Sequence, residues 1–531
     1  MKRIFIALIS LCTIVSAYAD GDILEIWNKA QLVAFRNDVN GGNNYSGKTV
    51  KLMADITIAK EDKWVPIGAT DNGKLFEGTF EGQGNTITIT VYSDNSTLGL
   101  FGYLRGTVQH LKVDGNITNT SSTLTSSTAG IAGYNRGTIS ECANLAYIVG
   151  TTAGGIAGEN HGTITNCYNQ GSIGATGNFD GDRFLGGIAG AIDGEKATIS
   201  NVYASCSIED YYTGLTGNIT NGGIVANPSK WTSSTCYYNV KLNGDTEMDG
   251  NTTLTGNALK SSFDNSKWTF TDGELPELTC FKNKIVRLSD NNDNSDILTS
   301  YNNQTCTVEL SGRTLYKDGK WNTLCLPFDL TLSGSVLNGD GVVAKKLDPY
   351  STILDGTKLT LVFDNAPATI LAGTPFIIKW NNTGVHLSNV QFNNVEINKT
   401  APTPVKFSTV CQFVGTYSPF SIGDTSNGTY DGDINEIILL SSDNTLGYSK
   451  NPRTLRSCRA HFMIPTSAGI RAMMDFDIDF DGGESTRITN MDSTDETDGN
   501  DGWWTLTGVK LDGKPTERGI YLHNGRKEAV Q

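Results

Sequence analysis

The sequence repeats itself around one stretch, Gly154-Gly155-Ile156-Ala157-Gly158-Glu159-Asn160-His161-Gly162-Thr163-Ile164-Thr165-Asn166-Cys167-Tyr168-Asn169. Aligning its copies on Gly155 produces four columns, and the spacing among the last three columns is the same in every repeat. The columns are Gly99, Gly130, Gly155, Gly187 and Gly223; Val108, Ile139, Ile164 and Ile199; Leu111, Cys142, Cys167, Val202 and Cys236; and Ile117, Ile148, Ile173, Ile208 and Leu242. The lengths between repeats vary, as in a stack of coils joined by adjustable loops.

Apolar and polar residues alternate over runs of three to five within each repeat. This period of two is typical of strands with one buried face. When the columns are in register, each coil places its isoleucines on those of the next coil, about 4.8 Å away. The pattern predicts an all-β parallel β-helix over the repeats, with the glycines at tight corners.

The remaining sequence divides the chain into six segments. They are a signal peptide (1–19), the β-helix with an N-terminal capping helix (20–243), a C-terminal cap and linker (244–296), an antiparallel β-sandwich (297–480), an acidic linker (481–502) and a small β tail (503–531). Residues 22–39 show a helical period that predicts the capping helix, with Asn28 as N-cap and Gly41-Gly42 at its end. The apolar run of the signal peptide is too short to span a membrane, so no transmembrane span is predicted.

Composition excludes several classes of partner. The formal net charge is −15 and there is no basic cluster, which argues against nucleic acid and anionic membranes. Nine of the ten cysteines follow the signal peptide and are spread thinly, which argues against a disulfide framework. Cys142 and Cys167 share a column, and we expect buried free thiols there because aliphatic residues fill that column elsewhere.

Residues 154–164 resemble the GLUG repeat, which occurs in bacterial surface adhesins and beside the peptidase domain of IgA-specific metallopeptidases. Residues 64–68 and 76–87 resemble the usual beginning of such arrays, and the resemblance covers roughly 22–280. It implies a right-handed parallel β-helix with an adhesive surface role and no catalytic residue. Residues 315–328 resemble a β-sandwich module of Gram-negative surface proteins, and 503–530 resemble a type IX secretion sorting tail. The expected location is secreted or at the cell surface, associated with the outer membrane of a Gram-negative bacterium.

Candidate site residues are few. The chain has five histidines and no HExxH motif, which argues against a zinc peptidase. Asp180, Asp182 and Arg183 on the long turn 175–186 form a candidate binding group, or simply solvate a loop. Trp321 is a candidate sugar-stacking platform, although the apolar run beside it favours burial. His161 stands on a turn, one coil after Arg136, and is expected to be exposed.

Calcium is the one cofactor that the sequence suggests. Asp477, Asp479 and Asp481 copy the opening of an EF-hand loop, but Ile488 replaces the glutamate expected at position twelve. The alternation of Asp with Phe and Ile favours an edge strand instead. No other metal or cofactor is predicted.

Two functional hypotheses follow. The first is a non-catalytic adhesin or ligand-display scaffold that binds a host surface or extracellular matrix protein, or a glycan. The alternative is a carbohydrate-active β-helix enzyme, a polysaccharide lyase or hydrolase. A groove holding two or more carboxylates within about 10 Å, drawn from Asp180, Asp182, Asp193 and Glu195, would favour the enzyme. A wall of Asn and Thr ladders would favour the scaffold.

Overall fold

The computed structural model forms two compact units, Met1–Lys284 and Ile285–Gln531. It describes residues 23–69, 73–121, 123, 126–177, 181–194, 196–209, 218–228, 232–243, 246–248, 252, 254, 259–355, 358–381, 384–423, 436–441, 444, 446–449, 451–464, 475–479, 503–504, 510–511, 519–523 and 526–530. The predicted signal peptide (1–19) and acidic linker (481–502) lie outside these residues.

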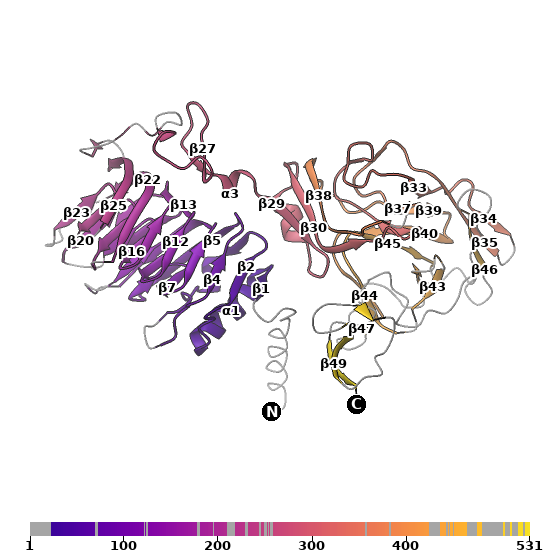
Figure 1. Cartoon of the computed structure of the whole chain (residues 1–531), viewed down its shortest axis with the longest axis horizontal. Helices are drawn as coiled ribbons and strands as arrows, with labels where there is room; N and C mark the ends of the chain where they lie inside the picture. The colour runs from indigo at the N-terminus through magenta and orange to yellow at the C-terminus, as the bar shows by residue number, and fades with distance from the viewer. Residues whose placement is uncertain are drawn as a thin grey trace. The chain divides into compact units, whose positions relative to one another are not determined.

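The first unit is a parallel β-helix (Figure 1), as the repeat predicted. Two of its sheets have five strands each and pair in parallel from coil to coil. One contains β6 (Thr97–Leu98), β10 (Ser127–Ala129), β15 (Thr152–Gly154), β20 (Arg183–Gly186) and β23 (Ile219–Gly222). The other contains β7 (Phe101–Leu104), β11 (Ala132–Asn135), β16 (Ala157–Asn160), β21 (Ala189–Ile192) and β24 (Val225–Pro228).

A third, 16-stranded sheet completes each coil. Its strands are β1 (Ile23–Ile26), β2 (Thr49–Leu52), β3 (Ile56–Ile58), β4 (Thr79–Glu81), β5 (Thr86–Ser93), β8 (Thr107–Gln109), β9 (Lys112–Asn119), β12 (Thr138–Ser140), β13 (Ala143–Asn144), β14 (Tyr147–Gly150), β17 (Thr163–Thr165), β18 (Tyr168–Asn169), β19 (Ile173–Ala175), β22 (Thr198–Glu209), β25 (Thr232–Leu242) and β26 (Thr246–Glu247). Only β26 pairs antiparallel, with β25. A short 3-10 helix, η1 (Lys60–Asp62), precedes β4.

The predicted columns stack in register. Ile139 pairs with Val108 on one side and with Ile164 on the other, and Ile164 pairs with Ile199. The last column is also in register from Ile117 to Leu242. Cys142 and Cys167 are fully buried free thiols, as predicted. The columns therefore form the core of the solenoid.

A ladder of buried asparagines explains why the aligned column of the repeat has glycine at Gly155. Asn144 donates from Nδ2 to Oδ1 of Asn169 at 2.8 Å, and neither side chain is exposed. Asn169 also holds its own corner, since it accepts from the Gly171 N–H (3.0 Å) and donates to the Gly171 carbonyl (2.9 Å). A Cβ at Gly155 would collide with the Asn169 side chain. Glycine is required there because the ladder occupies the space.

A second glycine column lies at a corner where two coils approach closely. A Cβ on Gly137 would collide with the carbonyl oxygen of Gly106, and one on Gly162 would collide with that of Gly137. Gly137 and Gly162 do not have a positive φ, so these corners need glycine for space rather than for backbone conformation. Left-handed backbone occurs instead at another corner, in His110 (φ 52°), Glu141 (51°), Asn166 (51°) and Asn201 (53°).

The N-terminal helix α1 (Lys29–Gly41) agrees with the prediction. Its N-cap is Asn28, whose side chain accepts from the Gln31 N–H at 3.0 Å, and Gly42 ends it with φ 117°. Leu32, Phe35 and Val39 are buried in the core of the solenoid. Phe35 packs edge-on against Phe76, so an aromatic cluster joins the helix to the first coils.

The segment 259–284, which we call the strap, runs along the side of the solenoid. It contains β27 (Trp268–Thr269), β28 (Glu277–Leu278) and helix α3 (Thr279–Lys282). Trp268 packs on Tyr168 and Tyr203, and the Tyr203 hydroxyl donates to the Pro276 carbonyl at 2.7 Å. The sequence assigned this segment to a cap and linker. Its apolar and aromatic side chains instead cover one wall of the solenoid.

The second unit contains a β-sandwich, as predicted. One sheet has the order β31 (Asn322–Leu324), β37 (Phe376–Trp380), β33 (Val342–Leu347), β35 (Lys358–Asn365) and β34 (Ile353–Asp355), with β46 (Asp475–Asp479) parallel to β35. The other has the order β39 (Val405–Phe407), β40 (Cys411–Thr416), β45 (Arg459–Met463), β42 (Ile437–Leu440) and β43 (Leu446–Tyr448). Phe363 from the first sheet packs against Phe413 and Phe462 from the second, so the core lies between the two sheets.

Smaller sheets complete the second unit. They comprise β29 (Ile285–Ser289), β30 (Thr305–Leu315) and β38 (Leu387–Glu396); β32 (Leu330–Thr331) with β36 (Thr369–Ile370); β41 (Phe420–Ile422) with β44 (Arg453–Leu455); and β48 (Lys510–Leu511), β47 (Trp503–Trp504), β49 (Gly519–His523) and β50 (Arg526–Val530). The last four form the expected β tail. Residues 285–296 are not a linker, because β29 pairs with β30 and helix α4 (Ser295–Ser300) follows it.

Candidate binding surface

The candidate group on the long turn is not brought together. Arg183 is 1% exposed, whereas Asp182 is exposed and accepts from the Asn218 N–H at 3.0 Å. Asp180 and Glu195 lie outside the described residues. The turn therefore exposes Asp182 to solvent but not Arg183.

Trp321 lies in the core of the sandwich. It is 1% exposed, and Lys379 places its ammonium 4.6 Å from the ring centroid. A ring enclosed in this way has no face on which a sugar can stack. The interpretation that favoured burial is confirmed, and the sugar platform is wrong.

The calcium candidates lie on a strand rather than in a loop. Asp477 is in register with Thr360 and Asp479 with Val362, across the parallel pair of β46 and β35. The side chain of Asp477 and all of Asp481 are outside the described residues. An extended strand cannot wrap around an ion as an EF-hand loop does. Within the described part of the chain, no three His, Cys, Asp or Glu residues are grouped to hold a metal ion.

One stretch of the solenoid surface carries a stack of aromatic rings. Tyr103 and Tyr134 occupy the same outward position of β7 and β11, and their ring centroids are 5.3 Å apart. His161, just after β16, stacks on Tyr134 with ring centroids 4.6 Å apart and an interplanar angle of 24°. The three rings follow one another along the solenoid axis, one per coil. All three are partly exposed.

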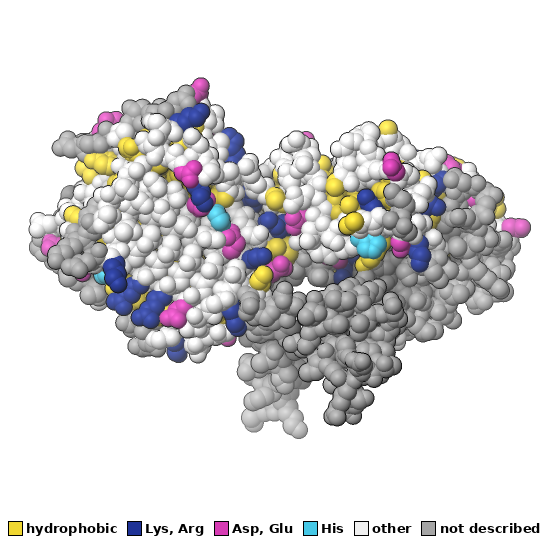
Figure 2. All heavy atoms as spheres, in the orientation of Figure 1, with side chains coloured by type: hydrophobic (Ala, Val, Ile, Leu, Met, Phe, Trp, Pro, Cys, Tyr) yellow, Lys and Arg dark blue, Asp and Glu magenta, His cyan; other side chains and the backbone are white. Residues whose placement is uncertain are grey.

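Charged side chains border these rings. The Arg136 guanidinium lies 5.1 Å from the Tyr134 centroid and donates to the Tyr134 hydroxyl at 3.1 Å. Arg105 pairs with Glu77 at 3.3 Å. Figure 2 shows basic, acidic and apolar side chains gathered over the position of β7 and β16, on a wall that is otherwise largely uncharged. We call the three rings with Arg105, Arg136 and Glu159 the aromatic row.

Glu159 is held ionised in the aromatic row. Partial burial acts to raise its pKa, but hydrogen bonds from His161 (3.5 Å) and the Ser127 hydroxyl (2.6 Å) outweigh it, and the pKa is lowered. An ionised, hydrogen-bonded carboxylate is suited to accepting hydrogen bonds from a ligand. It is a poor proton donor at neutral pH.

The neighbouring wall is a hydroxyl ladder. Thr138, Thr163 and Thr198 are in register on the outward side of β12, β17 and β22, and Thr198 donates to the Thr163 hydroxyl at 3.2 Å. Ser200 donates likewise to Thr165 at 3.0 Å. Hydroxyl groups bonded to one another therefore line this part of the wall, from β17 to β22.

A second charged group lies where the strap crosses the left-handed corner. Glu81 contacts Nδ1 of His110 at 2.9 Å, and Glu141 contacts Nε2 of His110 at 3.5 Å and Lys267 at 2.5 Å. The hydrogen bond that His110 donates to Glu81 raises the pKa of His110. Burial acts to raise the pKa of Glu81, but the hydrogen bonds that it accepts from His110 and Gln109 lower it. Because Lys267 belongs to the strap, these groups attach the strap to the coils.

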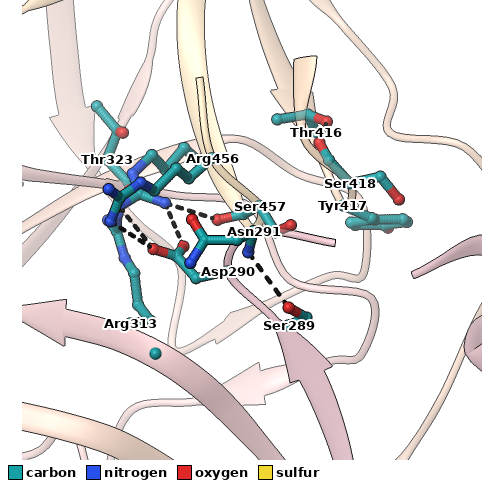
Figure 3. Close-up of polar contacts among 12 residues, drawn as sticks. Ser289, Asp290, Asn291, Arg313, Thr323, Thr416, Tyr417, Ser418, Arg456 and Ser457 are labelled. Carbon is teal, nitrogen blue, oxygen red and sulfur yellow. Dashed lines mark hydrogen bonds and ion pairs between the residues drawn. The ribbon is translucent and has the colours of Figure 1, made fainter. Parts of the chain in front are cut away.

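The second unit has a buried polar cluster (Figure 3). Asp290, 3% exposed, accepts from Nη1 of Arg459 and, at 3.3 Å, from its Nη2, and Arg456 lies 3.5 Å away. Nearby, Asn294 is fully buried and donates to the carbonyls of Ser289 and Tyr417. The sequence predicted that Asp290 and Asn294 belong to the linker that ends at residue 296. They instead join β29 to the strands that follow, and their contacts with one another fit a structural role.

Comparison with models of known protein families finds no match, and neither does comparison with curated proteins. Among solved structures, the chain is similar to a Bacteroides ovatus protein described as "a putative immunoglobulin A1 protease". The identity is 20% and the TM-score 0.37, over 49% of this chain and 93% of the other. A similarity of this size carries no argument about activity. The fold and surface define the class only as an all-β protein with a parallel β-helix and a separate β-sandwich.

The sequence contained a signal for the aromatic row that the prediction did not use. Tyr103 and Tyr134 share one column of the alignment, and Arg105, Arg136 and His161 share the column two residues later. When outward-facing positions of consecutive coils carry aromatic or basic residues, these residues form a continuous stripe on the surface. The expectation that His161 is exposed is only partly right, because its side chain is 22% exposed and stacks on Tyr134.

Proposed function

We propose that this protein is an exported, non-catalytic surface scaffold whose β-helix binds a ligand through the aromatic row. The observation that carries the proposal is the stack of Tyr103, Tyr134 and His161, partly exposed on a wall of short polar side chains. Aromatic and arginine side chains are over-represented at binding surfaces because they combine area with hydrogen bonding. The ligand is a host surface or matrix protein, or a glycan.

Export and display at the cell surface are part of this proposal. They are supported by the charged, apolar and small-x-small order of the first 19 residues and by the resemblance of the repeats to surface adhesins. Among the described helices, none has the length and apolar character needed to cross a membrane.

The catalytic alternative has less support. Glycosidases need two carboxylates with different protonation states, set about 5 to 10 Å apart around the scissile bond. Beside the aromatic row, Glu77 is paired with Arg105, and Glu159 is hydrogen-bonded with a lowered pKa. This arrangement favours binding over proton transfer.

A glycan and matrix-protein array with the full mature chain tests the proposal. We expect binding by the wild type, loss of binding in Tyr134→Ala, and retention in Tyr92→Ala, a matched control at an exposed tyrosine (48%) outside the row. Equal binding by all three proteins would place the ligand elsewhere. Turnover of a bound polysaccharide by the wild type would instead support the enzyme.

A further inference from the structure

We propose that the strap protects the solenoid against mechanical tension, because it makes a pull on the second unit enter the solenoid at its first coils and not at its last coil. The inference rests on the path of the strap along the coils and on the side chains that hold it there. It does not depend on which ligand the solenoid binds.

The strap runs back along the solenoid from the last coil to the first coils (Figure 1). Near its beginning, Phe263 packs edge-on against Tyr237 of β25, with ring centroids 5.7 Å apart. At its end, Lys284 pairs at 2.5 Å with Asp55, which lies between β2 and β3. Lys284 is also the last residue of the first unit. The chain therefore leaves this unit beside the first coils.

Side chains on the way attach the strap to the middle coils. Trp268 packs on Tyr203 and Tyr168, whose ring centroids lie 5.7 and 6.1 Å away. Tyr168 and Tyr203 are in register, so they belong to adjacent coils. Lys267 pairs at 2.5 Å with Glu141, which stands at the corner before β13, in the coil that precedes Tyr168.

Two further contacts reach the early coils. Glu277 lies 3.9 Å from Lys112, at the start of β9. A Cβ on Gly84, just before β5, would collide with the carbonyl oxygen of Cys280. The strap thus touches seven consecutive coils, whose strands pair in the order β3, β5, β9, β13, β18, β22 and β25. Since parallel strands repeat about every 4.8 Å, the strap spans about 29 Å.

Buried apolar side chains hold the strap in place. Trp268 and Leu278 are at most 1% exposed, and Phe263 and Phe281 pack in the same cluster as Tyr203. The ion pairs of the strap are partly exposed and contribute little by comparison, because solvent screens them. Detaching the strap therefore requires that these apolar side chains become exposed to water.

This path decides which contacts tension breaks first. In a solenoid each coil contacts only its neighbours, so a pull on the end of the last coil would lift β25 off β22 and then release the coils one after another. With the strap docked, a pull on the second unit acts first on Lys284. The chain between Lys284 and β25 bears no tension until Phe281 and Trp268 have been pulled out of their cluster. The strap therefore has to detach before the last coil can unwind.

Optical tweezers applied to the full mature chain test this inference. One handle is attached through an azide-bearing amino acid in place of the exposed Arg136, on a middle coil, and the other at the C-terminus. We expect strap detachment to precede every step of coil unwinding. The strap reaches about 90 Å when fully extended and spans about 29 Å when docked, so its detachment should lengthen the molecule by about 60 Å.

Substitutions in the strap should change the rate of this first step. At constant force, Trp268→Ala should raise the detachment rate about a hundredfold or more, because it removes the largest buried side chain of the strap. The milder Phe281→Leu keeps an apolar side chain and should raise the rate by about tenfold or less. The matched control is Trp321→Ala, which truncates an equally buried tryptophan of the second unit and should leave the detachment rate unchanged.

Two results would overturn the inference. The first is unwinding of the last coil before strap detachment or without it. The second is an unchanged detachment rate in both Trp268→Ala and Phe281→Leu. If circular dichroism shows that Trp268→Ala does not fold, Phe281→Leu alone decides: a faster detachment supports the inference, and an unchanged rate refutes it.

Discussion

Replacing Asn169 by alanine is expected to destabilise the centre of the solenoid strongly. The side chain is fully buried and makes three hydrogen bonds: one from Nδ2 of Asn144, one from the Gly171 N–H and one to the Gly171 carbonyl. Alanine leaves those three partner groups without this partner. An unsatisfied buried polar group costs about 1–3 kcal/mol. Allowing for partial relaxation, the expected loss is about 3–6 kcal/mol.

Native-state hydrogen exchange with mass spectrometry measures this loss where it occurs. In a repeat protein each coil contacts only its neighbours, so the opening free energy should fall most for peptides spanning residues 144–171. The matched control is Thr138→Ala on the outer wall, which removes a partly exposed methyl and hydroxyl and should cost less than about 1 kcal/mol. A loss below about 1 kcal/mol in Asn169→Ala would refute the ladder as a source of stability.

Three further predictions follow from the same contacts. Gly137→Ala should destabilise the solenoid by about 1–3 kcal/mol because its Cβ meets the backbone of the preceding coil, whereas Gly41→Ala, where the space is open, should be nearly neutral; denaturant melts compare them. Raising the pH from 6 to 9 should weaken the left-handed corner. The pKa of His110 is raised by Glu81, so its contribution is complete below its ordinary value of about 6.5 and is lost as the pH rises through the higher folded value. Hydrogen exchange at the corner should show this decline in the wild type and not in His110→Gln. Trp321→Ala should cost the sandwich about 3–5 kcal/mol in thermal unfolding and leave ligand affinity unchanged.

The solenoid was predictable because its signal is periodic. Ile139 and Ile164 recur at equal spacing, and in-register stacking of parallel strands is the arrangement that buries all of them at once. The reason for glycine was only partly predictable. A corner glycine can be required by φ or by space, and the sequence does not distinguish the collision at Gly137 from a left-handed turn.

The strap and the start of the second unit were not predictable from local pattern. Trp268 occurs in a segment without clear periodicity, and its partner Tyr168 lies about a hundred residues earlier in the chain. Likewise, Asp290 belongs to a run that is polar enough to suggest a linker. Its burial depends on Arg459, a contact between residues far apart in the sequence.

The predicted binding group was placed on a turn that interrupts the repeat, and the aromatic row was not predicted. The long turn containing Asp182 and Arg183 divides between solvent and core. The aromatic row lies instead within the regular coils, where outward residues vary from repeat to repeat while the core columns stay apolar. In a solenoid, binding chemistry can occupy the wall positions, because the inward positions alone are fixed by packing.

The position of the bound ligand in a crystal of the complex tests the proposed binding surface most directly. We expect the ligand to lie over β7, β11 and β16, within hydrogen-bonding distance of Arg136 and the Tyr134 hydroxyl. A ligand bound to the second unit, or in a cleft between two carboxylates elsewhere on the solenoid, would contradict it.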